Sequence, residues 1–309
     1  MIGPSTVAIS GSGGLVGTAL RETLAAEAGT RVIRLARPGS GGASSGRESA
    51  VLFDPVGGSI DAVRLEGCEA VVHLAGEPIA AGRWNAARKE KIRRSRVEGT
   101  RLVVEGLARL KTKPRVLVCA SAIGCYGSRG DEELTEGSPL GHDFLADVVR
   151  AWEAEAARAA TLGVRVVSLR LGIVLSTRGG ALAKMLTPFK LGLGGPLGTG
   201  RQWMSWIHID DLIAAILQAM RRDDLSGPIN AVAPEPSRNA DFTRALGAAL
   251  RRPAVLPAPA FALRLALGEM ADALLLSSQR VRPARLSTAG FVWKHPGLDA
   301  ALADLVARP

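Results

Sequence analysis

Three glycines spaced three residues apart lie close to the start of the chain and could cradle a phosphate group. The segment AISGSGGLVGTAL (8–20) places Gly11, Gly14 and Gly17 between a short apolar run and a helical pattern. In such a loop the first glycine makes a tight turn, the second lets backbone approach a pyrophosphate, and the third lets the helix pack on the sheet. The helix N-terminus then offers free amides to the phosphates. The sequence therefore predicts a dinucleotide-binding loop, against the alternative of a glycine-rich turn without a ligand. The residues of this loop are Gly11, Ser12, Gly13, Gly14, Leu15, Val16 and Gly17.

The end of the second expected strand indicates which dinucleotide the loop would hold. An acidic residue there would bind the ribose 2′-hydroxyl of NAD, but the segment reads Leu35-Ala36-Arg37 with no acid. Arg37 could pair with the 2′-phosphate of NADP, so we expect NADP(H) to be favoured over NAD(H). An ordinary exposed arginine is the alternative. Asp54, which precedes Pro55, suits either a contact with the adenine edge or a turn aspartate.

Short apolar runs alternate with helical patterns through the first half of the chain. Buried strands are predicted at residues 7–9, 31–36, 70–74, 115–120 and 165–169, and helices at 18–28, 86–110, 144–161 and 211–220. This alternation predicts a parallel sheet with helices on both faces, and wholly apolar strands suit a sheet buried on both sides. We therefore expect an α/β fold: a Rossmann-type doubly wound parallel sheet with a smaller, discontinuous C-terminal substrate lobe.

The rhythm of strands and helices breaks after residue 169. Glycine and proline become frequent over residues 172–200 and again from 227 onward, and residues 38–49 are rich in glycine and serine, as in loops. We expect residues 1–171, together with about 205–225, to form an NAD(P)-binding Rossmann domain. Residues 172–204 and 226–309 would form the smaller substrate-binding lobe.

Composition limits the classes of protein to consider. The chain has 309 residues, is 47% hydrophobic and carries a net charge of +10, which is enough for a large core. We expect no signal peptide and no membrane span, and three cysteines at no metal spacing suit a reducing cytoplasm. The charge alone does not indicate a nucleic-acid partner, because no binding motif accompanies it. The dense basic run at 83–101 is interpreted as a solvated helix face, with a phosphate-binding surface as the alternative.

Several motifs in order resemble those of the extended short-chain dehydrogenase/reductase family, over essentially the whole chain. They are the glycine loop, VVHLAG (71–76), VEGT (97–100), SAIGCYG (121–127) and WIHIDD (206–211). The resemblance implies that Leu74, Ala75 and Gly76 lie beside the cofactor. Three further segments narrow the resemblance to an atypical epimerase-family subgroup of oxidoreductases of unknown function: GEPIAAGRW (76–84), GRQWMSWIHIDDL (200–212) and RPARLSTAGFVWKHP (282–296).

The usual catalytic dyad of that family is absent. The family mechanism uses a tyrosine and a lysine four residues later, whose ammonium group lowers the tyrosine pKa for proton transfer. The single tyrosine is Tyr126, position 130 is Gly130, and the helix FLADVVRAWEAEA (144–156) carries neither residue. Ser121 could still donate a hydrogen bond to a substrate oxygen, and Tyr126 could be a proton donor or a packed tyrosine. Glu77 is expected at the cofactor rim, as an acid/base group or a ribose ligand.

The substrate pocket is expected to include Gly124, Trp203, Trp206 and His208. The two tryptophans would form either an aromatic wall or part of the core of the smaller lobe. A metal site at His208 is not expected, because Asp210 suits a helix N-cap and Asp211 a first-turn acid. No partner at metal spacing is seen for the other histidines, His73, His142 and His295.

Two functions remain open from the sequence. The first is an NADP-dependent oxidoreductase or epimerase that lacks the Tyr-x-x-x-Lys dyad. Its substrate would be a small molecule, and an anionic or nucleotide-linked one would suit the positive charge. The second is a non-catalytic NADP(H)-binding sensor or regulatory protein. We expect a small-molecule partner, no nucleic acid and no membrane; a homodimer stays open, since extended members of the family often pair through helices.

Overall fold

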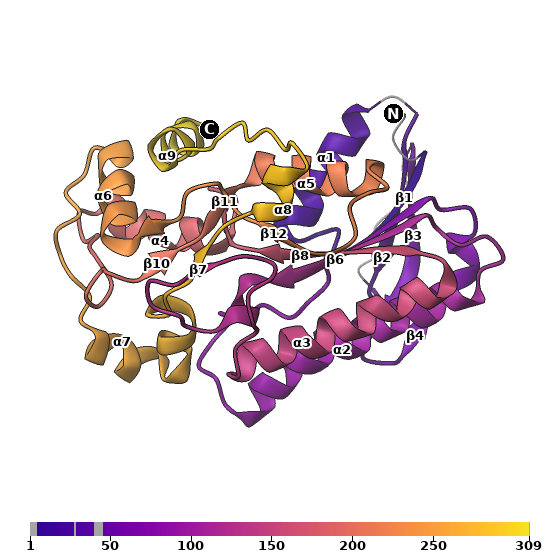
Figure 1. Cartoon of the computed structure of the whole chain (residues 1–309), viewed down its shortest axis with the longest axis horizontal. Helices are drawn as coiled ribbons and strands as arrows, with labels where there is room; N and C mark the ends of the chain where they lie inside the picture. The colour runs from indigo at the N-terminus through magenta and orange to yellow at the C-terminus, as the bar shows by residue number, and fades with distance from the viewer. Residues whose placement is uncertain (1–4, 28, 40–45, 309) are drawn as a thin grey trace.

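The computed structural model describes residues 5–27, 29–39 and 46–308. Its centre is an eight-stranded sheet in the order β12-β8-β6-β5-β1-β2-β3-β4 (Figure 1). Neighbouring strands are parallel except β3 and β4, which are antiparallel. The strands are β1 (Thr6–Ser10), β2 (Arg31–Ala36), β3 (Glu48–Asp54), β4 (Ser59–Ile60), β5 (Ala70–His73), β6 (Val116–Ala122), β8 (Arg165–Leu171) and β12 (Gly227–Ala231).

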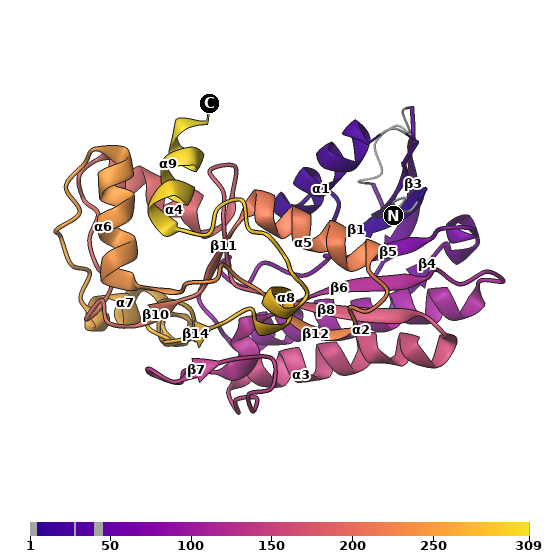
Figure 2. The same ribbon diagram turned by 45° about the horizontal axis from the view of Figure 1, so that its top comes forward.

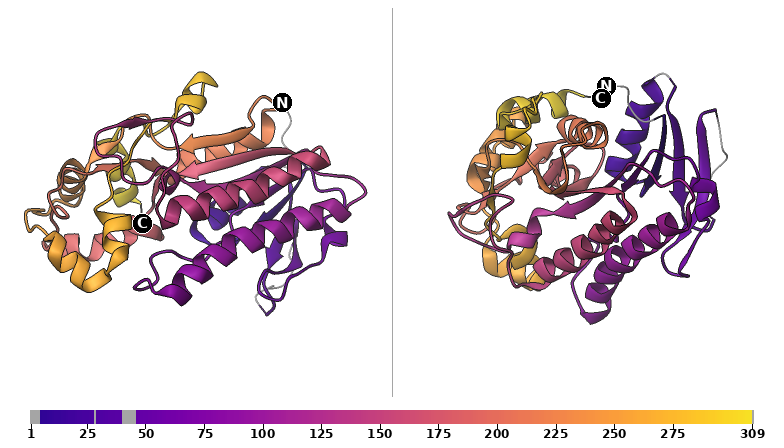
Figure 3. Two further views of the ribbon diagram at one scale, coloured as in Figure 1. Left: turned by 60° about the horizontal axis from the view of Figure 1, so that its bottom comes forward. Right: turned by 45° about the vertical axis from the view of Figure 1, so that its right-hand side comes forward.

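Helices cover both faces of this sheet. α2 (Ala86–Arg109) and α3 (Phe144–Ala157) lie side by side over one face, and α1 (Leu15–Ala26) and α5 (Ile209–Arg221) lie over the other (Figures 1 and 3). Successive side chains of β1 enter different cores: Val7 and Ile9 pack with residues of α1 and α5, and Ala8 packs with residues of α2 and α3. Both faces of the central strands are therefore buried, which explains why their sequences are apolar throughout.

The sheet has a topological switch point at β1. This strand lies between β2 and β5, and later strands are added on the β5 side. In open α/β sheets, ligands bind at the carboxyl ends of the strands at such a point. The glycine loop leaves β1 at this end, and the backbone N–H of Leu74, just after β5, donates to the carbonyl of Ser10 at 3.2 Å. The fold thus places the loop where a dinucleotide is expected.

The remaining elements form a smaller lobe at one end of the sheet, on the left in Figures 1 and 2. Its helices are α4 (Gly180–Lys190), α6 (Asn239–Leu250), α7 (Ala260–Leu267) and α9 (Leu298–Ala307), and α8 (Ala284–Thr288) contacts β12. Short strands pair as β7 (Glu133–Leu134) with β14 (Arg280–Val281), β9 (Ile173–Leu175) with β11 (Trp206–His208), and β10 (Trp203–Met204) with β13 (Ser237–Arg238). One hydrophobic core includes residues of both parts, among them Ile9, Leu212, Phe242 and Leu302. The lobe therefore shares its core with the sheet.

Short helical turns complete the set of elements. Three are 3₁₀ helices and the fourth is a π-helical turn: η1 (Ala62–Leu65), η2 (Ile123–Tyr126), η3 (Arg158–Leu162) and η4 (Ala271–Leu275). Within the described part of the chain, no helix is both long enough and apolar enough to cross a membrane.

Two boundaries differ from those expected: the start of the second part of the smaller lobe, and the end of the loop before β3. The smaller lobe was expected to begin again at residue 226, but β12 completes the edge of the main sheet because it pairs in parallel with β8. Its sequence, GPINA, has no apolar run that would mark it as a strand. The loop expected over 38–49 also ends earlier, because Glu48 already pairs with Val32 of β2. Residues 40–45 of that loop lie outside the described residues.

The first helix also begins earlier than expected. α1 starts at Leu15 rather than at residue 18, because Gly14 serves as its N-cap. It ends at Ala26, and the end expected at residue 28 lies outside the described residues.

Candidate functional site

Close backbone packing explains two glycines of the loop after β1. Gly11 has φ +67°, and a Cβ there would lie 2.8 Å from the carbonyl carbon of Leu74. A Cβ at Gly17 would lie 2.2 Å from the carbonyl oxygen of Gly11, so α1 can approach the loop only with glycine there. At Gly13, by contrast, no described atom lies within 4 Å of an added Cβ. The fold therefore requires Gly11 and Gly17, whereas Gly13 leaves open space that a ligand could approach closely.

The N-terminus of α1 suits an anion. Gly14 caps the helix without a side-chain hydrogen bond, and the first turn carries no acidic residue. The first amides of a helix have no intrahelical acceptor, so those after Gly14 can donate to phosphate oxygens. Ser12 is buried in the loop, and Leu15 and Val16 are half-buried in the first turn. The loop thus fits the pyrophosphate of a dinucleotide in both shape and polarity.

A cavity of about 890 Å³ reaches this loop along the groove between α1 and α5. Its lining includes Gly13 and Gly14, and also Arg178 and Arg308 from later segments. Arg178 is paired with Glu22 at 2.6 Å, and Arg308 with Asp210 at 2.7 Å. The cavity therefore extends from the loop along the helices, and these two arginines are already neutralised.

Ser10 ties the end of β1 to the end of β5. Its Oγ accepts hydrogen bonds from the backbone N–H groups of Leu74 at 3.1 Å and Ala75 at 3.2 Å, and it lies 2.6 Å from His73 Nδ1. The hydroxyl proton must then point at Nδ1, which places the ring proton of neutral His73 on Nε2. Burial lowers the pKa of His73 to about 4, so the ring is neutral at neutral pH. Leu74, Ala75 and Gly76 are thus held beside the glycine loop, and their contact with a cofactor stays a prediction.

Arg37 and Asp54 were expected to contact the adenosine end of the cofactor. Arg37 comes directly after β2, and Asp54 is the last residue of β3. Arg37 is exposed; its contact with a 2′-phosphate stays a prediction. The Oδ1 atom of Asp54 accepts hydrogen bonds from the backbone N–H groups of Val56 and Gly57, both at 3.0 Å. The structure therefore shows the turn role of Asp54, and its contact with adenine stays a prediction.

Ser121 lies near the carboxyl end of β6, opposite Arg170 of β8 in the sheet register. Its hydroxyl donates to Glu153 Oε1, on α3, at 2.6 Å. Glu153 also accepts two hydrogen bonds from Arg170, from Nε and Nη2, both at 2.8 Å. Such a bidentate pair fixes geometry as well as charge. Ser121 is thereby oriented toward Glu153 in a buried position, and its contact with a substrate stays a prediction.

Tyr126 is held on both sides of its hydroxyl. The hydroxyl donates to Asn230 Oδ1 at 2.7 Å and accepts from Arg170 Nη1 at 3.0 Å. The side chain is fully buried, and burial raises the pKa of Tyr126 well above its ordinary value. These contacts favour a packed tyrosine over a proton donor. We call Ser121, Glu153, Arg170, Tyr126 and Asn230 the Ser121 network.

Glu77 lies just beyond β5 and is held by two arginines of α2. Its Oε1 accepts from Arg88 Nη1 at 2.6 Å, and its carbonyl accepts from Arg96 Nη1 at 3.0 Å. Burial lowers the pKa of Arg96 to about 10, and its guanidinium lies 5.2 Å from the centre of the Trp152 ring. The side chain of Glu77 remains 36% exposed. Arg96 therefore fixes the backbone of Glu77, whose carboxylate stays at the surface of the site.

The expected substrate residues occupy different environments. Trp206 is 1% exposed and lies in the core, which leaves it little surface for a ligand. Trp203 is half-buried between the guanidinium groups of Arg238 and Arg280, at 4.3 and 5.0 Å from its ring centre. Gly124 lies in η2, after Ser121, where an added Cβ would lie 3.5 Å from Leu145 Cβ. Substrate contacts of Gly124 and Trp203 stay predictions, and Trp206 matches the core-packing alternative.

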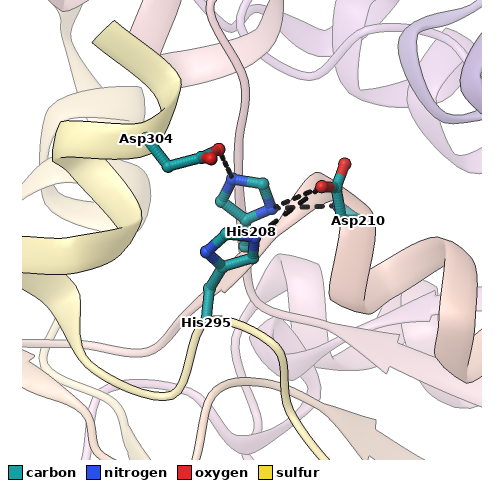
Figure 4. Close-up of side chains that lie close together, drawn as sticks. All are labelled: His208, Asp210, His295 and Asp304. Atoms are coloured by element: carbon teal, nitrogen blue, oxygen red, sulfur yellow. Dashed lines mark hydrogen bonds and ion pairs between the residues drawn. The ribbon is translucent and has the colours of Figure 1, made fainter. Parts of the chain in front are cut away.

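Four side chains from three segments of the chain lie close together (Figure 4). They are His208 at the end of β11, Asp210 in the first turn of α5, His295, and Asp304 of α9. The two imidazole rings stack with centroids 3.8 Å apart, and His208 Nε2 lies 3.2 Å from Asp304 Oδ2. Histidine nitrogens and carboxylate oxygens are ligands of many metal sites. Spacing along the chain did not indicate this grouping, because His295 and Asp304 come from the far end of the sequence.

Hydrogen bonding argues against a metal ion in this cluster. His208 Nδ1 accepts from the backbone N–H of Asp210 at 3.1 Å, so the proton of the neutral ring is on Nε2. Nε2 lies 3.2 Å from Asp304 Oδ2, but the two atoms form no hydrogen bond. Arg308 Nη2 lies 2.7 Å from Asp210 Oδ2 and 2.6 Å from Asp304 Oδ2. A guanidinium group thus already sits between the two carboxylates. We call His208, Asp210, His295, Asp304 and Arg308 the His208 clasp, because they join α9 to the start of α5.

The N-cap of α5 is not the residue expected from the sequence. His208 is the N-cap, and Asp210 and Asp211 are both first-turn acids, so the expectation that Asp210 caps the helix is wrong. The hydrogen bond from Arg308 holds the pKa of Asp210 well below its usual range. His208, expected in the substrate pocket, is fully buried in the clasp, and its expected contact with substrate stays untested.

Sequence reasoning missed Glu153, Arg170 and Asn230. The available signal for Arg170 was a charged residue inside the apolar strand RVVSLRL, since a buried guanidinium requires a charged or hydrogen-bonding partner. Glu153 supplies that partner from α3, and its position in the helix carries no comparable signal. Asn230 meets Tyr126 only because β12 joins the main sheet next to β8.

Comparisons with known proteins match nearly the whole chain. The model of the NAD dependent epimerase/dehydratase family matches residues 7–232, and that of a domain of unknown function, DUF1731, matches residues 258–305. Epimerase family protein SDR39U1 of Homo sapiens is 36% identical over 304 residues, which cover 97% of this chain and 99% of that protein. Epimerase family protein MT2273 of Mycobacterium tuberculosis is 39% identical over 305 residues, which cover 99% of each chain.

Solved structures also align with nearly the whole chain. The crystal structure of human SDR39U1 (isoform2) with NADPH aligns with a TM-score of 0.86 and 33% identity, covering 98% of this chain and 100% of that one. The nucleoside-diphosphate sugar epimerase from Corynebacterium glutamicum aligns with a TM-score of 0.79 and 39% identity, covering 97% of this chain and 58% of that one. MoeE5 in complex with UDP-glucuronic acid and NAD shares the fold, with a TM-score of 0.76 at 20% identity and 97% of each chain covered. The expected Rossmann-type α/β fold is confirmed.

Proposed function

Because the chain belongs to the NAD-dependent epimerase/dehydratase family, we propose that it is an NADP(H)-dependent oxidoreductase or epimerase that works without a Tyr-x-x-x-Lys dyad. Its substrate would be a small molecule, and an anionic or nucleotide-linked one would suit the net charge of +10. When bound, the cofactor would supply or accept a hydride at its nicotinamide ring. The observation that carries the proposal is the hydrogen bond that Ser121 donates to Glu153 of α3. Ser121 lies on β6, the second strand from β1 in the sheet order.

In this proposal Ser121 accepts the proton of the reacting hydroxyl. In the oxidising direction, the substrate hydroxyl donates to Ser121 Oγ while Ser121 donates to Glu153. As the hydride leaves carbon and the C=O bond forms, the substrate proton passes to Ser121, and the serine proton passes to Glu153. Reduction follows the same path in reverse, so atoms and charge balance. Arg170 acts as a positioning residue, because its two hydrogen bonds fix the orientation of the Glu153 carboxylate.

Two observations support NADP(H) as the cofactor. Arg37 follows β2, where an acid would favour NAD, and the human relative's crystal structure contains NADPH. Other structures of this fold contain NAD, so the preference needs a direct test. We would titrate the protein with NADPH and with NADH and follow nicotinamide fluorescence. NADPH should bind more tightly, and Arg37→Ala should weaken NADPH by about 10- to 100-fold, as expected for a charge-assisted hydrogen bond, while NADH changes little.

The matched control for Arg37→Ala is an exposed arginine that lies away from the end of β2. Arg64→Ala removes an exposed arginine from η1 and should leave both affinities unchanged. Equal affinity for the two nucleotides, or equal losses in Arg37→Ala and Arg64→Ala, would exclude Arg37 as the residue that selects NADP(H). If neither nucleotide binds, the proposed function fails as a whole.

A second candidate is a non-catalytic NADP(H)-binding sensor. It is favoured by the burial of Ser121, which is 2% exposed, and by the fully occupied hydroxyl of Tyr126. Ser121→Ala separates the two candidates. In an enzyme this variant should keep NADPH affinity and lose NADPH consumption with a substrate found by screening. In a sensor the wild-type protein itself should bind NADPH without consuming it, whatever substrate is offered.

A further inference from the structure

The smaller lobe carries exposed apolar side chains in two adjoining stretches. Ten large hydrophobic side chains are exposed in the described residues, and six of them belong to this lobe's residues 191–193 and 255–265: Leu191, Leu193, Val255, Leu256, Phe261 and Leu265. Leu191 is 68% exposed and Val255 is 73% exposed. Grouped exposed apolar side chains of this kind are typical of interaction sites rather than of free surface.

Hydrogen bonds hold the two stretches side by side. The backbone N–H of Leu256 donates to the carbonyl of Gly194 at 3.1 Å, and that of Ala258 donates to the carbonyl of Pro196 at 2.9 Å. A Cβ at Gly192 would lie 3.8 Å from the ring of Pro253. Figures 1 and 2 show the chain after α6 at the outer end of the lobe, far from β2 and β3. The leucines of the first stretch and the apolar residues of the second therefore belong to one region of the surface.

The same region is positively charged. The sequence has no aspartate or glutamate between residues 179 and 200 or between 242 and 268. Lys190, Arg251 and Arg252 are exposed, and within the part of the chain that the structure describes none of the three forms an ion pair. Arg264 of α7, by contrast, is paired with Asp272 at 2.9 Å. Three uncompensated positive charges thus accompany the exposed aliphatic side chains.

Arg251 occupies a backbone position that favours glycine. It is the C-cap of α6, with φ 53° and ψ 44°, and among the described residues it is the single non-glycine residue with positive φ. Helices commonly end with glycine in this left-handed conformation, because a Cβ is unfavourable there. A charged side chain occupies this position although glycine would suit the backbone better, and such an outlier is consistent with a role outside folding.

We propose that this region docks on a membrane surface rich in anionic lipids. The docking surface consists of Lys190, Leu191, Leu193, Arg251, Arg252, Val255 and Leu256. Its aliphatic side chains would enter the boundary between headgroups and acyl chains, and its basic side chains would lie against anionic headgroups. A nucleic acid fits less well, because single strands are bound by stacking on several aromatic rings, and Phe261 is the single aromatic residue among the six exposed apolar side chains. The proposal departs from the expectation of no membrane partner and is independent of the proposed catalytic role.

Vesicle sedimentation with the full chain tests the proposal. The protein should sediment with phosphatidylcholine vesicles that contain about 30% phosphatidylserine, and not with pure phosphatidylcholine, and roughly 0.5 M salt should release it. The double variant Arg251→Gly/Arg252→Ala should bind about 25-fold more weakly, at roughly five-fold for each lost charge (about 1 kcal/mol per basic residue). Because glycine suits the backbone at position 251, this variant should fold at least as well as the wild type.

Two single variants complete the design. Leu193→Asp should abolish vesicle binding by placing a carboxylate among the aliphatic side chains. Val56→Asp makes the same kind of change at a side chain that is 87% exposed between β3 and β4 and should leave binding unchanged. Equal binding to neutral and anionic vesicles, binding to neither, or unchanged binding in the Leu193 and arginine variants would overturn the proposal.

A second copy of the chain or a nucleic acid would give different results at this surface. A dimer in sedimentation equilibrium without lipid that Leu193→Asp dissociates would assign the surface to a second copy of the chain and overturn the proposal. Binding to duplex DNA that is tighter than binding to the anionic vesicles and is unaffected by Leu193→Asp would also overturn it.

Discussion

Arg170 on β8 donates a hydrogen bond to the hydroxyl of Tyr126 at 3.0 Å. The single tyrosine of the chain is thereby tied to the guanidinium group that also holds Glu153. Tyr126 is therefore a buried residue whose hydroxyl is held by two neighbours, which favours a packing role over proton transfer.

Tyr126→Phe should reduce stability and leave cofactor affinity unchanged. The substitution leaves Asn230 Oδ1 without its donor and Arg170 Nη1 without one acceptor. An unsatisfied buried polar group costs about 1–3 kcal/mol, so we expect the free energy of unfolding, measured by urea denaturation, to fall by about 2 kcal/mol. Unchanged stability, combined with a large loss of NADPH consumption, would instead identify Tyr126 as a proton donor.

The Glu153–Arg170 pair should show strong coupling in a double-mutant cycle. Arg170 is 4% exposed, so Glu153→Gln leaves a buried guanidinium without its counter-charge, at a cost of about 3 kcal/mol. Arg170→Met should cost a similar amount. The double variant should be more stable than the sum of the two losses predicts, with a coupling energy on the order of 1–3 kcal/mol in urea denaturation.

An exposed pair provides the comparison for this cycle. Arg94 and Glu98 lie one turn apart on α2 with side chains 51% and 38% exposed, and such pairs couple by about 0.3–0.5 kcal/mol. Equal coupling energies for the buried and the exposed pair would show that Arg170 does not hold Glu153 in solution as it does in the structure.

His73 should make the protein lose stability between pH 6.5 and pH 4. Its pKa is lowered by burial from 6.5 to about 4, so above pH 6.5 the ring is neutral in both folded and unfolded states. Between these values the unfolded chain binds a proton that the folded chain does not, and the free energy of unfolding falls as the pH falls. A shift of this size corresponds to about 3 kcal/mol in total. His73→Gln removes the titrating group, so urea denaturation at pH 7.5, 6 and 5 should give a smaller pH dependence for the variant. Identical slopes would mean that the pKa of His73 in the folded protein is not lowered from its value in the unfolded chain.

Two alanine substitutions should separate the structural glycines from the ligand-facing one. Gly17→Ala places a Cβ 2.2 Å from the Gly11 carbonyl oxygen, so we expect a loss of more than about 2 kcal/mol of stability together with a loss of NADPH binding. Gly13→Ala meets no described atom within 4 Å and should keep wild-type stability while it weakens NADPH binding. Wild-type affinity in the folded Gly13→Ala variant would show that the ligand does not approach the backbone at this glycine.

Local patterns in the sequence predicted most of the sheet and the glycine loop. The strands around Val7, Val32, Val72, Leu117 and Val167 are apolar because both of their faces are buried. Gly17 is required by a contact within the loop itself, whereas the close contact at Gly11 is with the distant Leu74. The apolar runs and the spacing of the glycines are local patterns, so they can be recognised from the sequence alone. The comparisons confirm the α/β fold that these patterns predicted.

The parts that could not be predicted depend on pairing between distant segments. Glu153 meets Ser121 and Arg170 because α3 packs beside β6 and β8, and no sequence period records that arrangement. In the same way, His295 and Asp304 reach His208 only after α9 returns to α5. A histidine cap was also not foreseen, because aspartate, asparagine, serine and threonine are the usual side chains at that position.

The outer strand of the sheet has a consequence for the behaviour of the protein at high concentration. An unpaired strand edge can template aggregation with another chain, but β12 offers few free groups. Pro228 has no N–H to donate, its carbonyl accepts from Arg285 Nη1 at 2.8 Å, and the backbone N–H of Asn230 donates to Glu136 at 3.0 Å. Side chains from neighbouring segments thus take the places that an incoming strand would need. In concentrated solutions, the β12 edge should therefore resist pairing with a strand of another chain.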